Sequence, residues 1–160
     1  MADVYVAGSL RHTPREWHSI YEEIGAVVES AGLTAHVPHV NTVNDLGLDV
    51  NHLQDPNFDL EIVLGARSRI YERNLEVVHN SKLIIAEVTD PSTGTGIEIG
   101  WALKLNKPVI CLAHKDANVT SMVLGPAQLG LVDFIWYENV EDALSKLKNL
   151  LENKFRGLRK

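Results

Sequence analysis

The stretch LIIAEVTDPSTGTGIEIG, residues 83–100, contains an apolar run, a turn rich in Pro, Ser, Thr and Gly, and a glutamate framed by glycines. The apolar run is short and rich in β-branched residues, which is typical of a buried strand in a parallel sheet. Ser92, Gly94 and Gly96 predict a loop whose backbone N–H groups can approach a ligand closely. The stretch therefore predicts a strand, an anion-binding loop and the start of a helix that carries Glu98.

Glu98 is the candidate for chemistry in this stretch. We expect its carboxylate to be ionised, because the N-terminus of a helix favours negative charge. A glutamate at this place can also serve the helix dipole alone, so the sequence leaves a structural role open. An ionised carboxylate beside a phosphate-binding loop favours chemistry on a phosphorylated sugar.

Further apolar runs on both sides predict four more strands, at 3–7, 33–37, 108–113 and 133–137. Amphipathic helical patterns separate them, so the order is strand and helix repeated five times. This order predicts one α/β domain over residues 1–160. We expect a Rossmann-like or flavodoxin-like five-stranded parallel sheet with helices on both faces.

The predicted helices begin at Pro14, at about Ser68, at Glu98 and at Val140. Between the second strand and the helix at Ser68, the pattern loosens over residues 41–65, which predicts a lid that covers a substrate.

Composition limits the classes of partner. The chain has 160 residues, 45% of them hydrophobic, with 15 Lys and Arg against 21 Asp and Glu. The net charge of −6 argues against non-specific binding to nucleic acid or to an anionic membrane, so a small-molecule partner is expected. The single cysteine, the lack of a leader pattern and the lack of a long apolar run predict a cytoplasmic protein.

A second group of polar residues follows the first predicted strand. Gly8, Ser9 and Arg11 lie where a parallel strand ends, which is the edge where open α/β sheets bind ligands. Together with Ser92 and Gly94 they could form one anion site, although Arg11 could equally be a solvated loop cation. The GTG sequence differs from the GxGxxG dinucleotide motif, and no nucleotide cofactor is predicted.

His36 and His39 have the HxxH spacing that recurs in metal sites. At the end of a strand this spacing places the two rings on opposite faces, and no third ligand is evident, so we predict no metal. His36 remains a candidate substrate contact, because its ring can face the cleft.

Three motifs together resemble the nucleoside 2-deoxyribosyltransferase superfamily, and most closely its branch of 2′-deoxynucleoside 5′-phosphate N-hydrolases. They are GSLR at 8–11, YERNLEVV at 71–78 and AEVTDPSTGTGIEIGWAL at 86–103. The resemblance implies that Glu98 is the nucleophile that attacks C1′ of the sugar. The base then leaves, and water or a second base takes up the glycosyl group.

The resemblance also implies the roles of the neighbouring residues. Transferases of the superfamily carry an acidic residue at the position of Ser92, which suits a free 5′-hydroxyl. The neutral Ser92 and the presence of Arg11 favour a 5′-phosphate instead. A serine from a neighbouring subunit completes the phosphate site in the family, and Thr120 or Ser121 is its match here, which implies a homodimer or a larger assembly.

Asn74 departs from the family pattern, which has an aspartate at this position. The resemblance implies that Tyr5 and Asn74 position the nucleophile and the base, but an asparagine cannot donate a proton as an acid. The leading hypothesis is a hydrolase of (deoxy)nucleoside 5′-monophosphates without a cofactor. A base-exchanging transferase, a hydrolase of ribonucleotides and a nucleotide sensor without turnover remain open.

Overall fold

The computed structural model describes residues 1–9, 19–48 and 60–158, with side chains from residue 65 onward in the last range. Arg11 and the predicted helix start at Pro14 lie outside the described residues.

Five parallel strands form one sheet in the order β2-β1-β3-β4-β5. They are β1 (Val4–Ala7), β2 (Ala35–His36), β3 (Leu83–Glu87), β4 (Val109–His114) and β5 (Asp133–Tyr137). The predicted parallel sheet is confirmed, and its order is that of flavodoxin-like folds.

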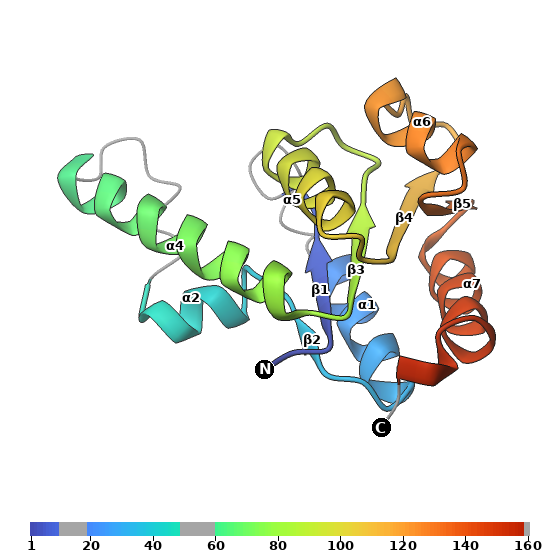
Figure 1. The fold of residues 1–160 in the computed structure, drawn as a ribbon, viewed down its shortest axis with the longest axis horizontal. Helices are drawn as coiled ribbons and strands as arrows, with labels where there is room; N and C mark the ends of the chain where they lie inside the picture. The colour runs from blue at the N-terminus through green and yellow to red at the C-terminus, as the bar shows by residue number, and fades with distance from the viewer. Residues whose placement is uncertain (10–18, 49–59, 159–160) are drawn as a thin grey trace.

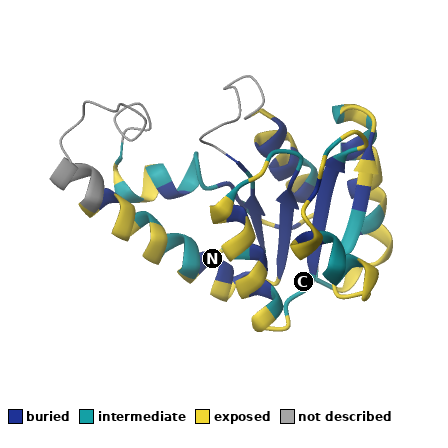
Figure 2. Cartoon of the chain, turned by 90° about the horizontal axis from the view of Figure 1, so that it is seen from above, coloured by how far each residue is buried: buried dark blue, intermediate teal, exposed yellow. Residues whose placement is uncertain are grey.

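The central strands are buried on both faces, which explains their continuous apolar sequence. Alternate side chains of β1 enter different cores: Val4 and Val6 belong to one, Tyr5 and Ala7 to the other. Figure 2 shows the buried strands in dark blue between helices with exposed outer faces.

Helices cover both faces of the sheet, as predicted (Figure 1). The helices α1 (Ser19–Ser30) and α7 (Val140–Asn153) pack on the core that contains Val4. Residues of α4 (Leu60–Asn80), α5 (Thr93–Lys104) and α6 (Ser121–Gln128) form the core that contains Tyr5.

The segment predicted as a loose lid, 41–65, is partly helical. It contains α2 (Asn41–Leu46) and the first turns of α4, which begins at Leu60 and not at about Ser68. Figure 1 shows that α2 and the N-terminal part of α4 extend beyond the sheet. A helix that does not cover the sheet needs no long apolar stripe, so its sequence pattern is weak. Residues 49–59 lie outside the described part of the chain, and a covering role for the segment remains a prediction.

Residues 121–128 form α6, although their composition is that of a loop. Gly125 and Pro126 suggested a loop, but the helix has a cap: Oγ1 of Thr120 accepts the N–H of Met122 at 3.3 Å. Val123 is buried in the core, and its packing supports the helix in spite of the proline.

The strand order reverses between β1 and β3, which pair directly with the register Val4↔Leu83 to Ala7↔Ala86. The segments that follow these two strands therefore border the crevice where such sheets bind ligands. Gly8 is required there, because a Cβ at this position would lie 2.1 Å from the ring of Tyr21.

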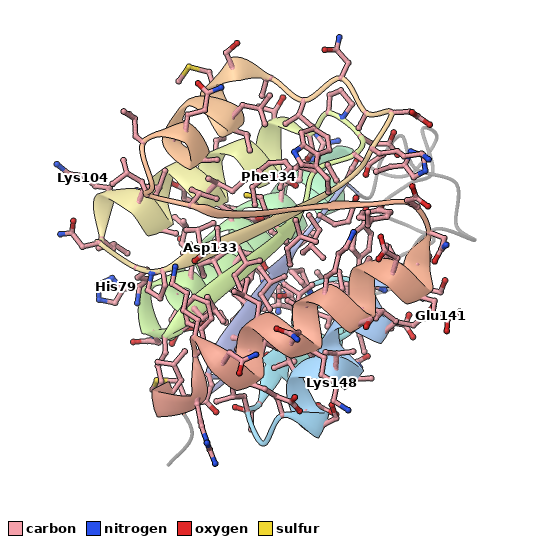
Figure 3. The ribbon with its side chains drawn as sticks, turned by 90° about the vertical axis from the view of Figure 1, so that its right-hand side faces the viewer. His79, Lys104, Asp133, Phe134, Glu141 and Lys148 are labelled. Atoms are coloured by element: carbon pink, nitrogen blue, oxygen red, sulfur yellow. The ribbon has the colours of Figure 1, made fainter. Side chains whose placement is uncertain are left out.

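The strand β5 forms one edge of the sheet, and Figure 3 shows Asp133 and Phe134 on it, beside α7 with Glu141 and Lys148. Two lysines of the C-terminal region bind this edge. Lys146 Nζ donates to the backbone oxygen of Trp136 at 2.9 Å, and Lys154 Nζ lies 2.6 Å from Asp133 Oδ1. Such charges protect an edge strand from pairing with another chain.

No helix in the described part of the chain has the length and apolar character that crossing a membrane requires.

Candidate active site

Glu98 lies on α5 beyond its first turn, and its carboxylate meets the side chain of Tyr5 from β1. The hydroxyl of Tyr5 donates to Oε1 of Glu98 over 2.6 Å. Tyr5 is fully buried, on the face of the sheet that α5 covers. Burial, followed by the charge of Glu98, raises the pKa of Tyr5 well above its ordinary value, so the hydroxyl keeps its proton and acts as a donor.

Burial raises the pKa of Glu98 from 4.5 to about 7, although hydrogen bonds from Tyr5 and Asn74 act in the opposite direction. The expectation of a fully ionised carboxylate at a helix start is therefore corrected. Glu98 is not in the first turn of α5, where the helix dipole is strongest, and the loss of hydration dominates. Near pH 7 the ionised and protonated forms coexist, roughly half each at a pKa of about 7.

Asn74 connects Glu98 with two further polar side chains. The side chain of Asn74 lies near the Glu98 carboxylate and acts to lower its pKa. Oδ1 of Asn74 accepts from Oγ1 of Thr42 over 2.7 Å, and Oγ1 of Thr42 lies 2.7 Å from Nε2 of His36. The ring of His36 stacks on Tyr5 with a centroid distance of 5.8 Å and an interplanar angle of 12°. These five side chains form a closed circuit, which we call the Glu98 circuit.

His36 is buried and neutral. Burial lowers its pKa from 6.5 to about 4, with a smaller contribution from the positive charge of Arg73. His39 lies apart, because its Nε2 is 3.1 Å from Oε1 of Glu22. The HxxH pair therefore does not converge on one point. Among the described residues, no group of three or more His, Cys, Asp or Glu side chains is arranged to hold a metal ion.

Ser92 caps α5 and faces a cavity beside its N-terminus. Oγ of Ser92 accepts the N–H of Thr95 at 3.3 Å, and the backbone oxygen of Ser92 accepts from Gly96 at 3.0 Å. The cavity measures about 250 Å³ and is lined by the segment after β3, the start of α5 and residues 118–120. Thr95 lines it as well, and its buried Oγ1 has no partner within the described part of the chain. A polar ligand would satisfy this hydroxyl.

The other predicted binding residues are placed as follows. Gly96 and Thr120 line the same cavity as Ser92, whereas Ser121 is exposed at the start of α6 and Gly94 is exposed in the first turn of α5. Glu98 is not among the residues that line this cavity. Thr120 is thus brought to Ser92 of its own chain, and not to the carboxylate of Glu98.

Ser9 is buried at the end of β1, and its backbone oxygen accepts from Oη of Tyr21 over 2.8 Å. This bond and the close contact of Gly8 with the Tyr21 ring anchor the start of the β1 loop to α1. The first strand therefore presents Gly8 and Ser9 at the crevice. Arg11, the predicted cation of this site, lies outside the described residues.

Sequence reasoning missed a second buried carboxylate, Glu87, at the end of β3. Its Oε1 accepts from Oη of Tyr137 at 2.8 Å and from the backbone N–H and the hydroxyl of Thr89. Oγ1 of Thr89 in turn accepts from the N–H of His114 at 2.9 Å. These bonds join the ends of β3, β4 and β5 and hold the segment that leads to Ser92. The sequence does place this acidic residue directly after a buried apolar run, and that position could have indicated a buried carboxylate.

Thr42 was missed as well, and nothing in its sequence context indicated it. It lies in α2, within a segment whose pattern predicted no helix, and its contacts to His36 and Asn74 join three separate elements.

The profile of the family described as nucleoside 2-deoxyribosyltransferase matches residues 4–153. Two named relatives are similar to the chain. A 5-hydroxymethyl-dUMP N-hydrolase of Esox lucius is 31% identical over 161 residues, 98% of each chain. A protein of Methanosarcina barkeri with the provisional name 2′-deoxynucleoside 5′-phosphate N-hydrolase 1 is 40% identical over 87 residues, 53% of this chain and 55% of the relative. The chain thus spans about half the length of this archaeal relative.

Solved structures share the fold. The CMP N-glycosidase of Clostridium botulinum superposes with a TM-score of 0.57 at 20% identity, over 92% of this chain and 99% of that one. A 2-deoxyribosyltransferase of Bacillus psychrosaccharolyticus superposes with a TM-score of 0.58 at 18% identity, over 90% and 94%. At these identities the likeness concerns the fold.

Proposed function

Because the chain belongs to the nucleoside 2-deoxyribosyltransferase family, we propose that it is an N-glycoside hydrolase of deoxynucleoside 5′-monophosphates. Its products are the free base and deoxyribose 5-phosphate. The names of its relatives support hydrolysis of a nucleotide substrate. The observation that carries the proposal is the buried carboxylate of Glu98, which accepts a hydrogen bond from Tyr5 and whose pKa Asn74 acts to lower.

Glu98 is the nucleophile in this reaction. Its ionised carboxylate attacks C1′ as the bond to the base breaks, and a glycosyl ester of Glu98 forms. The bonding electrons leave with the base, which takes up a proton. Water then attacks C1′, releases the sugar phosphate and restores the carboxylate. A pKa of about 7 leaves a large share of Glu98 in the nucleophilic form at neutral pH, while burial keeps that carboxylate reactive.

The 5′-phosphate binds at the ends of β1 and β3. Gly8 and Ser9 approach it from the end of β1, and the start of α5 approaches it with Ser92, Gly94 and Gly96. Arg11, whose part in phosphate binding the family resemblance implies, lies outside the described residues. Three features support this assignment: the N-terminus of α5 attracts anions, Ser92 adds no negative charge, and the buried hydroxyl of Thr95 has no partner among the described residues. His36 lies on the other side of Tyr5 and lines the place of the sugar or the base.

Asn74 stabilises the ionised form of Glu98 as a hydrogen-bond donor. It cannot protonate the leaving base, so the proton on the departing base comes from solvent or from the protonated fraction of neighbouring groups. The reaction remains possible without an acid at position 74, and we expect a modest rate of base departure.

We also propose that the enzyme is a homodimer. Thr120 lines the Ser92 cavity of its own chain, so the exposed Ser121 is the residue that reaches the partner's phosphate site. An exposed apolar groove supports self-association. It measures about 460 Å³, lies between α4 and α5 and is lined by Tyr71, Leu75, Trp101 and Leu105 among others. Exposed apolar surface of this kind marks protein interfaces.

Transfer of the glycosyl group to a second base is the alternative reaction, supported by the description of the family itself. The deciding experiment incubates the enzyme with a panel of nucleosides, deoxynucleoside 5′-monophosphates and ribonucleotides, with and without a second free base, and identifies the products by chromatography and mass spectrometry. Free base with deoxyribose 5-phosphate supports hydrolysis, whereas a new nucleoside or nucleotide supports transfer. Recovery of every nucleotide unchanged after hours at high enzyme concentration would support a sensor and overturn the proposal.

A further inference from the structure

Thr42 lies at the centre of the Glu98 circuit, although the reaction as described assigns it no part. It belongs to α2 and is 1% exposed. We propose that Thr42 is a positioning residue that orients the amide of Asn74, so that Nδ2 of Asn74 faces the carboxylate of Glu98. This inference rests on the proposed function, because it assigns Thr42 to the reaction at Glu98.

The hydroxyl of Thr42 has a single proton, which determines the direction of the circuit. It donates this proton to Oδ1 of Asn74 over 2.7 Å. Its contact of 2.7 Å with Nε2 of His36 must then be one in which Thr42 accepts, so Nε2 carries the proton of the neutral ring. With Oδ1 engaged by Thr42, the side of Asn74 that remains for Glu98 is the NH₂ group.

The charges around the circuit agree with this direction. His36 is held neutral by burial, and Arg73 of α4 opposes its protonation while Asp45 of α2 favours it. Tyr5 of β1 keeps its proton and donates to Glu98. Donors on both sides of a buried carboxylate stabilise its ionised form.

The reversed orientation of the Asn74 amide would have the opposite effect on the ionisation of Glu98. If Nδ2 of Asn74 faced Thr42, the carbonyl oxygen of Asn74 would face Glu98 and repel its negative charge. The ionised nucleophile would then be destabilised and its protonated form favoured. A free asparagine side chain can adopt either orientation. With the proton of the neutral ring on Nε2 of His36, the Thr42 hydroxyl accepts from His36 and must donate to Asn74, which selects the orientation that supports the nucleophile.

The contact between Thr42 and Asn74 is fixed by the packing of α2 on α4. Nη2 of Arg73 lies 2.7 Å from Oδ2 of Asp45, and Nη2 of Arg69 donates to the backbone oxygen of Leu46 at 3.0 Å. These two arginines lie on the same helix as Asn74. Thr42 therefore reaches Asn74 from a helix that α4 itself holds in place.

The test measures the pKa of Glu98 without substrate, by NMR titration of ¹³C-labelled glutamate carboxyl groups, with Glu98→Gln used to assign the signal. Thr42→Val removes the hydroxyl at similar volume and releases the Asn74 amide, so the pKa of Glu98 should rise by about 0.5 to 1 unit. Thr42→Ser restores the hydroxyl and should return the wild-type value. Ser81→Ala is the matched control, because Ser81 is also buried and donates its hydroxyl proton to a backbone oxygen. That oxygen belongs to Val77, in the last turn of α4.

An unchanged or lowered pKa of Glu98 in Thr42→Val overturns the proposal, and a lowered value indicates the reversed amide. If Thr42→Val does not fold, Thr42→Ala carries the same test. Thr42→Val should also shift the acid limb of the kcat/KM profile to higher pH by the same amount, with KM nearly constant. In an Asn74→Ala background the Thr42 substitution should have no further effect on either readout. Because the titration needs no turnover, failure of the positioning role and failure of the proposed reaction are separately visible.

Discussion

The hydroxyl of Tyr5, on the first strand, donates a 2.6 Å hydrogen bond to the carboxylate of Glu98, on the helix that follows the third strand. The two residues meet because β1 and β3 are neighbours in the sheet and α5 covers the face to which Tyr5 points. Through this bond the first strand acts directly on the ionisation of Glu98.

Replacing Tyr5 with Phe removes that donor and should raise the pKa of Glu98 further, since burial already raises it to about 7. We expect kcat/KM at neutral pH to fall by about 10- to 100-fold, the value of one hydrogen bond to a charged group. The acid limb of the pH profile should move to higher pH. Tyr137→Phe is the matched control, because Tyr137 donates to the other buried carboxylate, Glu87, at 2.8 Å. An equal shift of the limb in both variants would contradict the assignment.

Glu98→Gln should abolish turnover and stabilise the fold at alkaline pH. The pKa of Glu98 is raised from 4.5 in the unfolded chain to about 7, so the native state loses stability as pH rises from about 4.5 to 7 and regains none above it. Removing the charge should therefore raise the free energy of unfolding at pH 8.5 by up to about 3 kcal/mol and change it little at pH 4.5. Denaturant unfolding at both pH values measures this difference. Equal effects at the two pH values would mean that the carboxylate is not destabilised by burial.

Asn74→Asp places a second carboxylate against Glu98. Two close carboxyl groups share a proton, so we expect the first ionisation of the pair to be lowered and the second to be raised above that of Glu98 alone. The protonated member can donate to the leaving base, and kcat near neutral pH should rise. Steady-state rates between pH 5 and 9 measure both effects. A lower kcat with an unchanged pH profile would show that Asn74 does not act on Glu98.

Ser92 can be tested by a pair of substitutions that separate its two roles. Ser92→Asp keeps a good helix cap but introduces a negative charge, so KM for a 5′-monophosphate should rise at least tenfold while stability changes little. Ser92→Ala loses the bond to Thr95 N–H and should lower the free energy of unfolding by about 1 kcal/mol. Kinetics with a nucleoside and its monophosphate, together with denaturant unfolding, separate the roles. If Ser92→Asp leaves the KM of the monophosphate unchanged, the phosphate does not bind beside Ser92.

Trp101→Glu tests the proposed homodimer. Trp101 is 37% exposed in the groove between α4 and α5, where its ring centroid lies 6.2 Å from that of Tyr71. A charge at this position should shift the protein toward monomer in light scattering coupled to gel filtration. Trp136→Glu is the control, because Trp136 is 40% exposed on the edge strand β5, the side of the molecule seen in Figure 3. Dissociation by Trp136→Glu alone would place the interface at β5 instead.

The parallel sheet, the helices on its two faces and the family could all be predicted from the amino-acid sequence. Strands buried on both faces must be continuously apolar, so the run at 83–86 was recognisable from a few residues. The glycine loop predicted after it was wrong, because α5 begins at Thr93 and Gly94 and Gly96 lie within that helix. The family resemblance, confirmed by the profile match, also predicted that Tyr5 and Asn74 act on Glu98.

The ionisation of Glu98 and the identity of the side chains around it could be read only from the folded structure. Its pKa depends on how much water the surrounding elements exclude, and no local pattern records that quantity. Thr42 contributes through an arrangement in which β2, α2, α4 and α5 converge, each from a different part of the chain. A single threonine in a weakly patterned segment cannot be recognised as functional from the sequence, because its contacts are with residues that only folding brings near it.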